Sequence, residues 1–400
     1  MKKQQQKSAL VFLVFLGFIS LLSDFTHEGA RSIYGSYLGL IGVSAFLISL
    51  ISGLGEFLGQ ALRIGTGIIA DRTRKYWFMM ILGYAINLLA IPLIALTNES
   101  IWQVALVLIL LERVGKAIRA PAKSALVSFT TPQLGAGKAF AIQEALDQLG
   151  AFLGPLFVFA ILSVRDQPTI TDYQLSFALL GIFAIMTLVL LVIAKRKYPH
   201  PDEFETKTLV SGFRSSKTFI LYLFAISFIA FGFIDFPVIA FHLDQSGTIP
   251  AVMIPLLYAF AMGIDAISAL FFGHLFDKIG IKSLIIAIGL SLAFAPLIFL
   301  TETRFSIIAG VLFWGVGMGA HESILKSVVA LIVSKEKRAT AYGIFNSVFG
   351  LAWFLGSVTI GLLYEWSLIA LVAVSLSAEG IGCLLLLSFI HYKKDRLNSF

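Results

Sequence analysis

The chain has 400 residues, of which 58% are hydrophobic and only 13% are charged, and its mean hydropathy is +0.91. Soluble domains contain about 45–50% apolar and about 25% charged residues, so this composition excludes an ordinary soluble protein and indicates a membrane protein. The formal net charge is +7, and the single cysteine, Cys383, excludes an internal disulfide; no Cys/His spacing typical of a metal site is present.

Apolar runs of membrane-spanning length recur along the whole chain. A bilayer core of about 30 Å needs roughly 20 apolar residues per helix, and lipid requires a backbone whose polar groups are paired internally, so these runs predict helices. The first run follows a basic head, as in a signal peptide, but charged residues and no clean cleavage site come next, so we expect a retained helix. The twelve predicted spans lie near residues 9–37, 43–70, 76–97, 101–122, 138–163, 174–194, 218–243, 251–276, 281–301, 304–333, 339–363 and 367–391.

The lysines and arginines of the connecting segments fall almost entirely in alternate segments. Residues 72–75, 195–217 and 335–338 belong to this set, whereas the opposite set contains only Arg165 and Arg304. Cytoplasmic loops of membrane proteins carry such an excess of positive charge. Both termini and the basic loops are therefore predicted to face the cytoplasm, in the inner or plasma membrane. The positive charge is then a topology signal, and we expect no nucleic acid as a partner.

The first two spans carry charges inside the apolar region, where an ionised group costs about 2.5–3.5 kcal/mol and usually marks a pathway or an ion pair. Asp24, Glu28 and Arg31 recur with helical spacing on one stripe of the first span, together with His27, and Asp24 can pair along it with Glu28 or Arg31. The stripe is either a proton or substrate site in the outer half or a structural ion pair. In the second span, Glu56 and Arg63 share a face, and function and an interhelix pair remain open alternatives.

The loop after the second span has an acid and several bases: Gly67, Asp71, Arg72, Arg74 and Lys75. A carboxylate at a helix C-terminus is unfavourable unless cations or a neighbouring helix N-terminus meet it. The cost of Asp71 therefore depends on conformation, and we predict a charge latch. A solvated basic loop is the alternative.

The fourth span contains LERVGKAIRAPAKS at residues 111–124. One arc of this helix carries charged residues in its inner half, and the acid-first spacing favours a Glu112–Lys116 pair. The arc either attracts an anionic substrate or forms ion pairs with the acids of the next span. For its last two cations, Arg119 and Lys123, the alternative is that their side chains extend toward the cytoplasm. Its members are Glu112, Arg113, Lys116, Arg119 and Lys123.

The fifth span contains EALDQLGAFLGP at residues 144–155. Glu144 and Asp147 share a face with Gln148, and two acids so close repel each other if both are ionised. Either they share a proton, as a proton-coupled site requires, or a cation such as Arg113 or Lys116 compensates in a structural salt bridge. The small residues Gly150 and Gly154 permit close helix packing, and Pro155 permits a bend.

The second half of the chain repeats the first. The longest loop divides six spans from six, which predicts an N-terminal bundle at 1–194, a linker at 195–217 and a C-terminal bundle at 218–400. The aligned segments place Asp235 opposite Asp24, Asp277 opposite Asp71, and Glu322 opposite Arg119, so Arg119 and Glu322 are a candidate inner gate pair. Asp235 and Asp265 are the candidate proton-coupling or substrate-cavity residues of this half, and its other polar interior residues are His321, Lys326, Asn346 and, in the last span, Glu379.

These features resemble the major facilitator superfamily of transporters over nearly the whole chain. Residues 67–75 match the family's loop signature after its second helix, with Arg74 where glycine is usual, and the second copy keeps Gly273, Asp277, Lys278 and Gly280. The resemblance implies an all-α membrane fold of two pseudo-symmetric six-helix bundles, related by an axis along the membrane normal. It also implies a cytoplasmic latch at both loops. Gly150, Gly154 and Pro155 resemble the helix-5 signature of the family's antiporters, without the glycines that usually follow the proline.

The sequence therefore predicts a secondary active transporter that moves a small organic solute by alternating access, coupled to protons, with export favoured. Proton-coupled uptake is the second alternative. A membrane-embedded enzyme built on His321 and Glu322, or a sensor, is a remote one. No Gly-rich nucleotide-binding motif is present, which argues against ATP as the energy source. We expect a monomer in the bilayer with no cofactor or metal.

Overall fold

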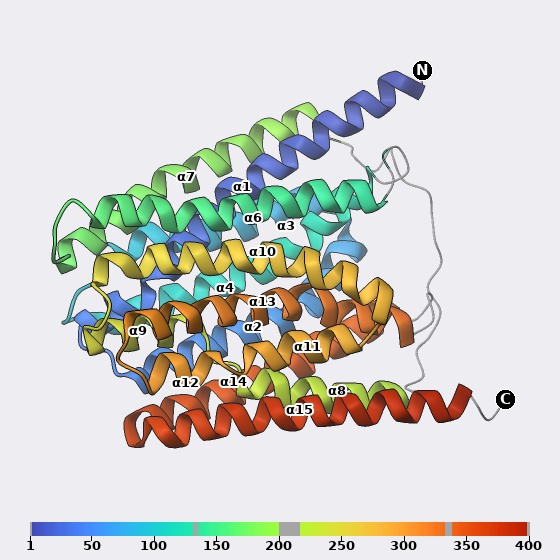
Figure 1. Cartoon of the computed structure of the whole chain (residues 1–400). Coiled ribbons are helices and arrows are strands. Elements are labelled where there is room, and N and C mark those ends of the chain that lie inside the picture. Colours follow the sequence, from blue (N-terminus) through green and yellow to red (C-terminus); the bar gives the residue numbers. More distant parts are fainter. Residues whose placement is uncertain (1, 131–133, 135, 200–216, 333–337, 398–400) are drawn as a thin grey trace. The chain divides into compact units, whose positions relative to one another are not determined.

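The computed structural model is nearly all helical, and it describes residues 2–130, 134, 136–199, 217–332 and 338–397 (Figure 1). Each predicted apolar run falls on helix, and two runs are interrupted. The helices are α1 (Lys2–Leu40), α2 (Ala45–Thr73), α3 (Tyr76–Ile94), α4 (Trp102–Ser128), α6 (Ala136–Leu162), α7 (Ile170–Lys197), α8 (Lys217–Gly232), α9 (Phe236–Ser246), the short 3₁₀ helix η2 (Ala251–Met253), α10 (Ile254–Ile279), α11 (Lys282–Ser291), α12 (Phe294–Phe299), α13 (Arg304–Ile332), α14 (Arg338–Trp366) and α15 (Leu368–Leu397).

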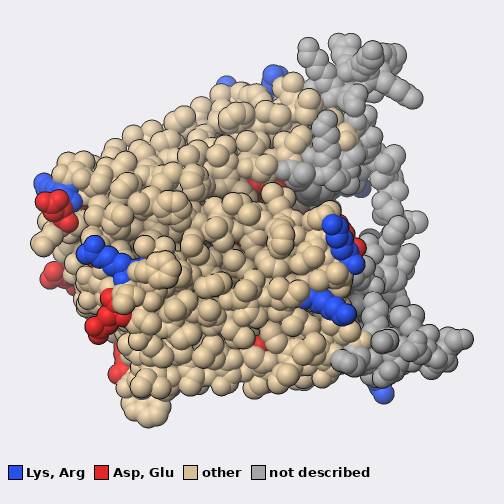
Figure 2. Space-filling model, in the orientation of Figure 1, with Lys and Arg blue, Asp and Glu red and all other residues tan. Residues whose placement is uncertain are grey.

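Within the described residues, ten helical segments are long and apolar enough to cross a membrane. α4 is not among them, because five charged residues lie between positions 112 and 123. The outward faces of the segments are apolar: on α7, the side chains of Ile182, Ile185 and Val189 are each more than half exposed. Figure 2 shows a surface that is mostly uncharged along the helices. The chain is therefore built as a multi-pass membrane protein.

The chain forms two compact units. The first contains Met1–Gly42, Leu58–Thr208 and Ala251–Ala259, and the second contains Val43–Phe57, Leu209–Pro250 and Phe260–Phe400. α2 and α10 thus contribute residues to both units. The predicted linker at 195–217 lies mostly outside the described residues, so the division into two six-helix bundles stays a prediction.

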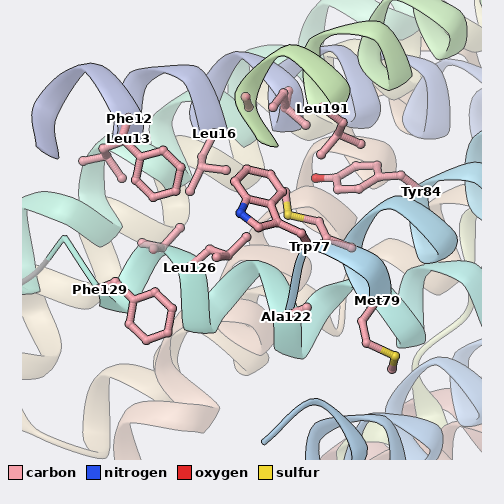
Figure 3. Close-up of a cluster of buried hydrophobic side chains, with 14 of the residues drawn as sticks. Phe12, Leu13, Leu16, Trp77, Met79, Tyr84, Ala122, Leu126, Phe129 and Leu191 are labelled. Atoms are coloured by element: carbon pink, nitrogen blue, oxygen red, sulfur yellow. The ribbon is translucent and has the colours of Figure 1, made fainter. Parts of the chain in front are cut away.

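The core of the first unit is an apolar cluster drawn from α1, α3, α4 and α7 (Figure 3). Phe12, Leu16 and Tyr84 are fully buried in it, and the ring nitrogen of Trp77 donates a hydrogen bond of 3.0 Å to the carbonyl oxygen of Tyr198. Lipid is as apolar as this core, so close packing and hydrogen bonds, rather than removal of surface from water, hold such helices together.

The backbones of α1 and α6 approach each other closely. A Cβ atom added at Gly150 would lie 2.2 Å from the carbonyl oxygen of Leu21, and one added at Gly154 would lie 2.1 Å from that of Phe25. Only glycine allows backbones to approach this closely. The two glycines singled out in the sequence therefore bring the face of α6 directly against α1.

In the second unit, the interruption between α8 and α9 is stabilised by side chains. Oδ1 of Asp235 accepts a 2.9 Å hydrogen bond from the N–H of Phe236 and so caps α9. The carbonyl oxygens of Gly232 and Ile234 accept hydrogen bonds from Ser375 (2.7 Å) and Trp314 (2.8 Å). Because lipid offers no partners to free backbone groups, these contacts let the helix break inside an apolar segment. Asp235, predicted to line a cavity, thus also has a structural role.

Candidate functional site

The interior of the first unit contains a cluster of ionisable side chains from α1, α4 and α6, which we call the charge cluster. His27 lies in it, fully buried. Its Nδ1 atom is 2.8 Å from Oε1 of Glu112, and its Nε2 atom is 3.4 Å from Oε1 of Glu28, although neither contact has the alignment of a straight hydrogen bond. The members of the cluster are Asp24, His27, Glu28, Arg31, Glu112, Arg113, Lys116, Arg119, Lys123 and Asp147.

The stripe predicted on the first span includes His27 and Glu28, and both lie on α1. The structure places its imidazole between two carboxylates from different helices. The one sequence signal was its place on the stripe between Asp24 and Glu28. Imidazole and carboxyl groups can each hold or give up a proton, and here three of them adjoin one another.

Glu112 is fully buried on α4 and is held from α3. The side-chain amide of Asn87 donates hydrogen bonds to Oε1 of Glu112 and, at 2.9 Å, to the carbonyl oxygen of the same residue. Nε of Arg113 lies 3.5 Å from Oε2 of Glu112. Gly115 makes this possible, because a Cβ there would lie 2.3 Å from the backbone nitrogen of Asn87. Asn87, an uncharged residue in an apolar run, was missed in the sequence.

Glu28 has three neighbours. The hydroxyl of Tyr258, at the start of α10, donates a 2.6 Å hydrogen bond to Oε2 of Glu28. Nη1 of Arg31 lies 3.7 Å from the same oxygen, and His27 lies on the other. Tyr258 belongs to the first unit and was also missed, because nothing in the sequence relates it to a residue so distant along the chain.

The α4 arc clamps acids of two other helices. Nη2 of Arg119 is 3.3 Å from Oδ1 of Asp24, and its guanidinium lies 4.4 Å from the centre of the Tyr84 ring. Nζ of Lys123 is 2.7 Å from Oδ2 of Asp147, whose other oxygen accepts a 2.8 Å hydrogen bond from Gln143. The Lys123–Asp147 pair is the clamp on the next span that the sequence left as one alternative, whereas Arg119 pairs with α1 instead, and neither cation is exposed.

Two pairings that helical spacing allowed are not the ones that the described residues make. Asp24 could have paired along its own helix, but the cation beside it is Arg119 on α4. Glu112 was expected to pair with Lys116 one turn later, but it contacts His27, Asn87 and Arg113 instead. In both cases an interhelical partner replaced the one that local spacing favoured, because helix packing places it closer than the flexible i,i+4 pair.

Lys116 is left without a close partner. Among the described residues, no hydrogen bond or ion pair joins its ammonium group, although it interacts electrostatically with Glu28 and Asp24. Its side chain is half-buried. Of the α4 cations, it is the one that the described residues leave without an ion pair.

The predicted pair of acids on α6 separates in the structure. Asp147 is half-buried and bound by Lys123, where Arg113 or Lys116 had been expected, whereas Glu144 is exposed and has a hydrogen-bond contact of 3.4 Å with Gln148. Glu56 and Arg63 on α2 are both half-buried, in different units. In the second unit, Asp265 on α10 is 2% exposed.

Glu379 on α15 is a further buried acid that the sequence reasoning noted but did not place in a site. It is fully buried, and its Oε2 atom lies 3.4 Å from Oγ of Ser291. Within the part of the chain that the structure describes, no cation lies within ion-pair distance of it. His321 lies on α13, and neither of its buried ring nitrogens has a hydrogen-bond partner among the described residues. The centre of its ring is 4.5 Å from the centre of the Phe233 ring.

The two predicted latch loops share a backbone conformation. Arg74 has a φ of 53° and Gly280 a φ of 62°, and the N–H of each donates a 2.8 Å hydrogen bond to the carbonyl four residues earlier. This left-handed helix end is the conformation that glycine adopts most easily, so Arg74 takes a strained position where the family pattern has glycine.

The charges of these loops point outward where they are described. Arg72, Arg74, Lys75, Asp277 and Lys278 are exposed. The side chain of Asp71 lies outside the described residues, as does that of Glu322. The latch and the Arg119–Glu322 gate therefore stay predictions. Among the described residues, no group of three or more histidine, cysteine or acidic side chains is placed to hold a metal ion.

Comparisons with known proteins give a consistent result. A sequence profile of the Major Facilitator Superfamily matches residues 9–357. An uncharacterised protein of Mycobacterium tuberculosis is 36% identical over 379 residues, covering 93% of this chain and 91% of the relative. An uncharacterised MFS-type transporter of Methanocaldococcus jannaschii is 31% identical over 366 residues, covering 88% of each chain.

Solved structures show the same fold. The nucleoside transporter NupG superposes with a TM-score of 0.72 at 14% identity, over 95% of this chain and 98% of that one. A bacterial homologue of the human lysosomal transporter Spinster, in an inward-facing conformation, gives a TM-score of 0.67 at 16% identity, over 96% and 95%. The profile, the relatives and the fold identify a transporter rather than an enzyme, and the chain belongs to the major facilitator superfamily.

Proposed function

We propose that the protein is a secondary active transporter that moves a small organic solute across the cytoplasmic membrane by alternating access, coupled to protons. The observation that carries the proton coupling is His27, buried between the carboxylates of Glu28 and Glu112. These three groups are placed to share protons in a region where a net charge is expensive.

The surroundings of this triad support a coupling role. Glu112 contacts Arg113, and Glu28 contacts Arg31, so a proton gained by either acid weakens its hold on a cation. The released cation is then free to take another partner or a solute. Protonation thus changes the contacts among α1, α4 and α10, which is the kind of differential interaction that shifts a conformational equilibrium.

Export is the direction we favour, because the Gly150, Gly154 and Pro155 pattern resembles that of the family's antiporters. The two glycines support close α1–α6 packing in this chain, which fits either direction. Proton-coupled uptake is therefore the second candidate, and the sign of the proton movement separates the two.

The test is proton flux in proteoliposomes that enclose a pH-sensitive dye. The purified protein is challenged with amino acids, organic acids, sugars, nucleosides and lipophilic cations, and Glu112→Gln is compared with wild type. Glu99→Gln, which makes the same change at an exposed acid outside the cluster, is the control. We expect a solute-dependent proton flux in wild type and in Glu99→Gln, and its loss in Glu112→Gln.

Two outcomes would contradict the proposal. Solute movement without proton movement in wild type would remove the coupling, and retained coupling in Glu112→Gln would remove the triad as its site. Protons that leave the vesicle as solute enters indicate exchange, and protons that enter together with solute indicate symport.

A further inference from the structure

The charge cluster of the first unit contains one cation more than its acids pair with. Each of its four carboxylates lies close to a cation from the cluster: Glu28 to Arg31, Glu112 to Arg113, Asp24 to Arg119, and Asp147 to Lys123. The remaining cation is Lys116, for which the described residues supply neither an ion pair nor a hydrogen bond.

The environment of Lys116 distinguishes it from its neighbours. The side chains of Arg113 and Arg119 are 5% and 3% exposed and each lies within ion-pair distance of a carboxylate, whereas Lys116 is half-buried and has no such ion pair among the described residues. A charge that is partly withdrawn from water and has no partner is costly. An anion at this position would remove that cost.

We propose that Lys116 binds a negatively charged oxygen group, a carboxylate or a phosphate, of the transported solute. The identification of this anion with the solute rests on the proposed transport function. A cationic solute fits the cluster less well, because its four carboxylates already have donors. The described residues supply no cation to Glu144 either, but Glu144 is exposed, so water can solvate its charge.

The neighbouring acids explain how such a site avoids permanent occupancy. Lys116 interacts electrostatically with Glu28 and Asp24, both of which repel an anion when they are ionised. A proton on Glu28 reduces that repulsion and strengthens the attraction of the anion. Proton binding and anion binding at Lys116 therefore favour each other.

The test compares two aldehydes that react with lysine amines and differ in charge. Pyridoxal 5′-phosphate carries an anionic group and pyridoxal does not; each is added to the purified full-length protein, the imine is trapped with borohydride, and labelling is measured by peptide mass spectrometry. Lys195, an exposed lysine on α7, is the internal reference. We expect the phosphate-to-neutral labelling ratio to be at least several-fold higher at Lys116 than at Lys195.

An equal or lower ratio at Lys116, or no labelling there by either reagent, overturns the proposal. A Lys116→Gln variant, with Lys195→Gln as its control, checks the transported solute found in the proton-flux assay. We expect that solute to be anionic and its half-saturating concentration to rise at least tenfold in Lys116→Gln only. A neutral or cationic solute also overturns the proposal. Preferential labelling without proton coupling would leave the anion site standing and remove only the coupling.

Discussion

The α1–α6 contact provides a direct test of the packing argument, through Gly154→Ala. An added Cβ would lie 2.1 Å from the carbonyl oxygen of Phe25 and 3.0 Å from the backbone nitrogen of Gly29. A relaxed carbon–oxygen contact is about 3.3 Å or longer, so the overlap is roughly 1 Å. The atoms in the way are backbone, which has no rotamer to change, so the helices must separate.

The expected magnitude follows from two opposing effects. Overpacking of this kind costs typically about 1–3 kcal/mol, and a clash with backbone belongs at the upper end. Alanine in a helix is favoured over glycine by about 1 kcal/mol, which offsets part of this cost. The net loss is about 2 kcal/mol, and for a unit of this size that lowers the midpoint of thermal unfolding by roughly 4–8 °C.

The assay is thermal unfolding of the purified protein in one detergent, followed by tryptophan fluorescence. Gly380→Ala on α15 is the matched control, because an added Cβ there has no atom within 4 Å. We expect its unfolding midpoint to stay unchanged or to rise slightly. An unchanged or higher midpoint for Gly154→Ala would refute the claim that this glycine is needed for close approach of the two helices.

Three further predictions concern other contacts. Arg74→Gly should raise the midpoint of thermal unfolding. Arg74 adopts a left-handed backbone conformation, which costs a residue with a side chain about 1–2 kcal/mol and costs glycine little. A lower midpoint would show that Arg74 makes a compensating contact. Lys123→Met and Asp147→Asn should each lower the free energy of unfolding. The double variant should lose less than the sum of the two single losses, with a coupling energy of about 0.5–3 kcal/mol. Strictly additive losses would contradict the ion pair. Glu379→Gln should unfold at nearly the wild-type temperature in the same assay. Glu379 is buried with no cation near it among the described residues, and such an acid is best accommodated uncharged. A marked loss of stability would show that the charge is required.

Much of the fold was predictable because lipid leaves few choices. Long apolar runs must form helices in a bilayer, so each predicted run is helical in the structure. Helical periodicity is also local, and it correctly placed Asp24, His27, Glu28 and Arg31 close together along α1. The interruptions at 233–235 and 292–293 were not predicted. The first depends on hydrogen bonds from Trp314 and Ser375, which lie far away in the sequence.

The sequence by itself determined which residues carry charge into the interior and on which stripe of a helix each one lies. It did not determine their partners, because a partner depends on how each helix is rotated about its own axis and how near its neighbour comes. Glu144 and Asp147 show this: three residues leave their side chains about 60° apart around the helix, and this difference is enough for one acid to meet Lys123 while the other is exposed. Only the tertiary structure, through the close approach that Gly115 allows, brought Asn87 to Glu112 and left Lys116 without an ion pair among the described residues.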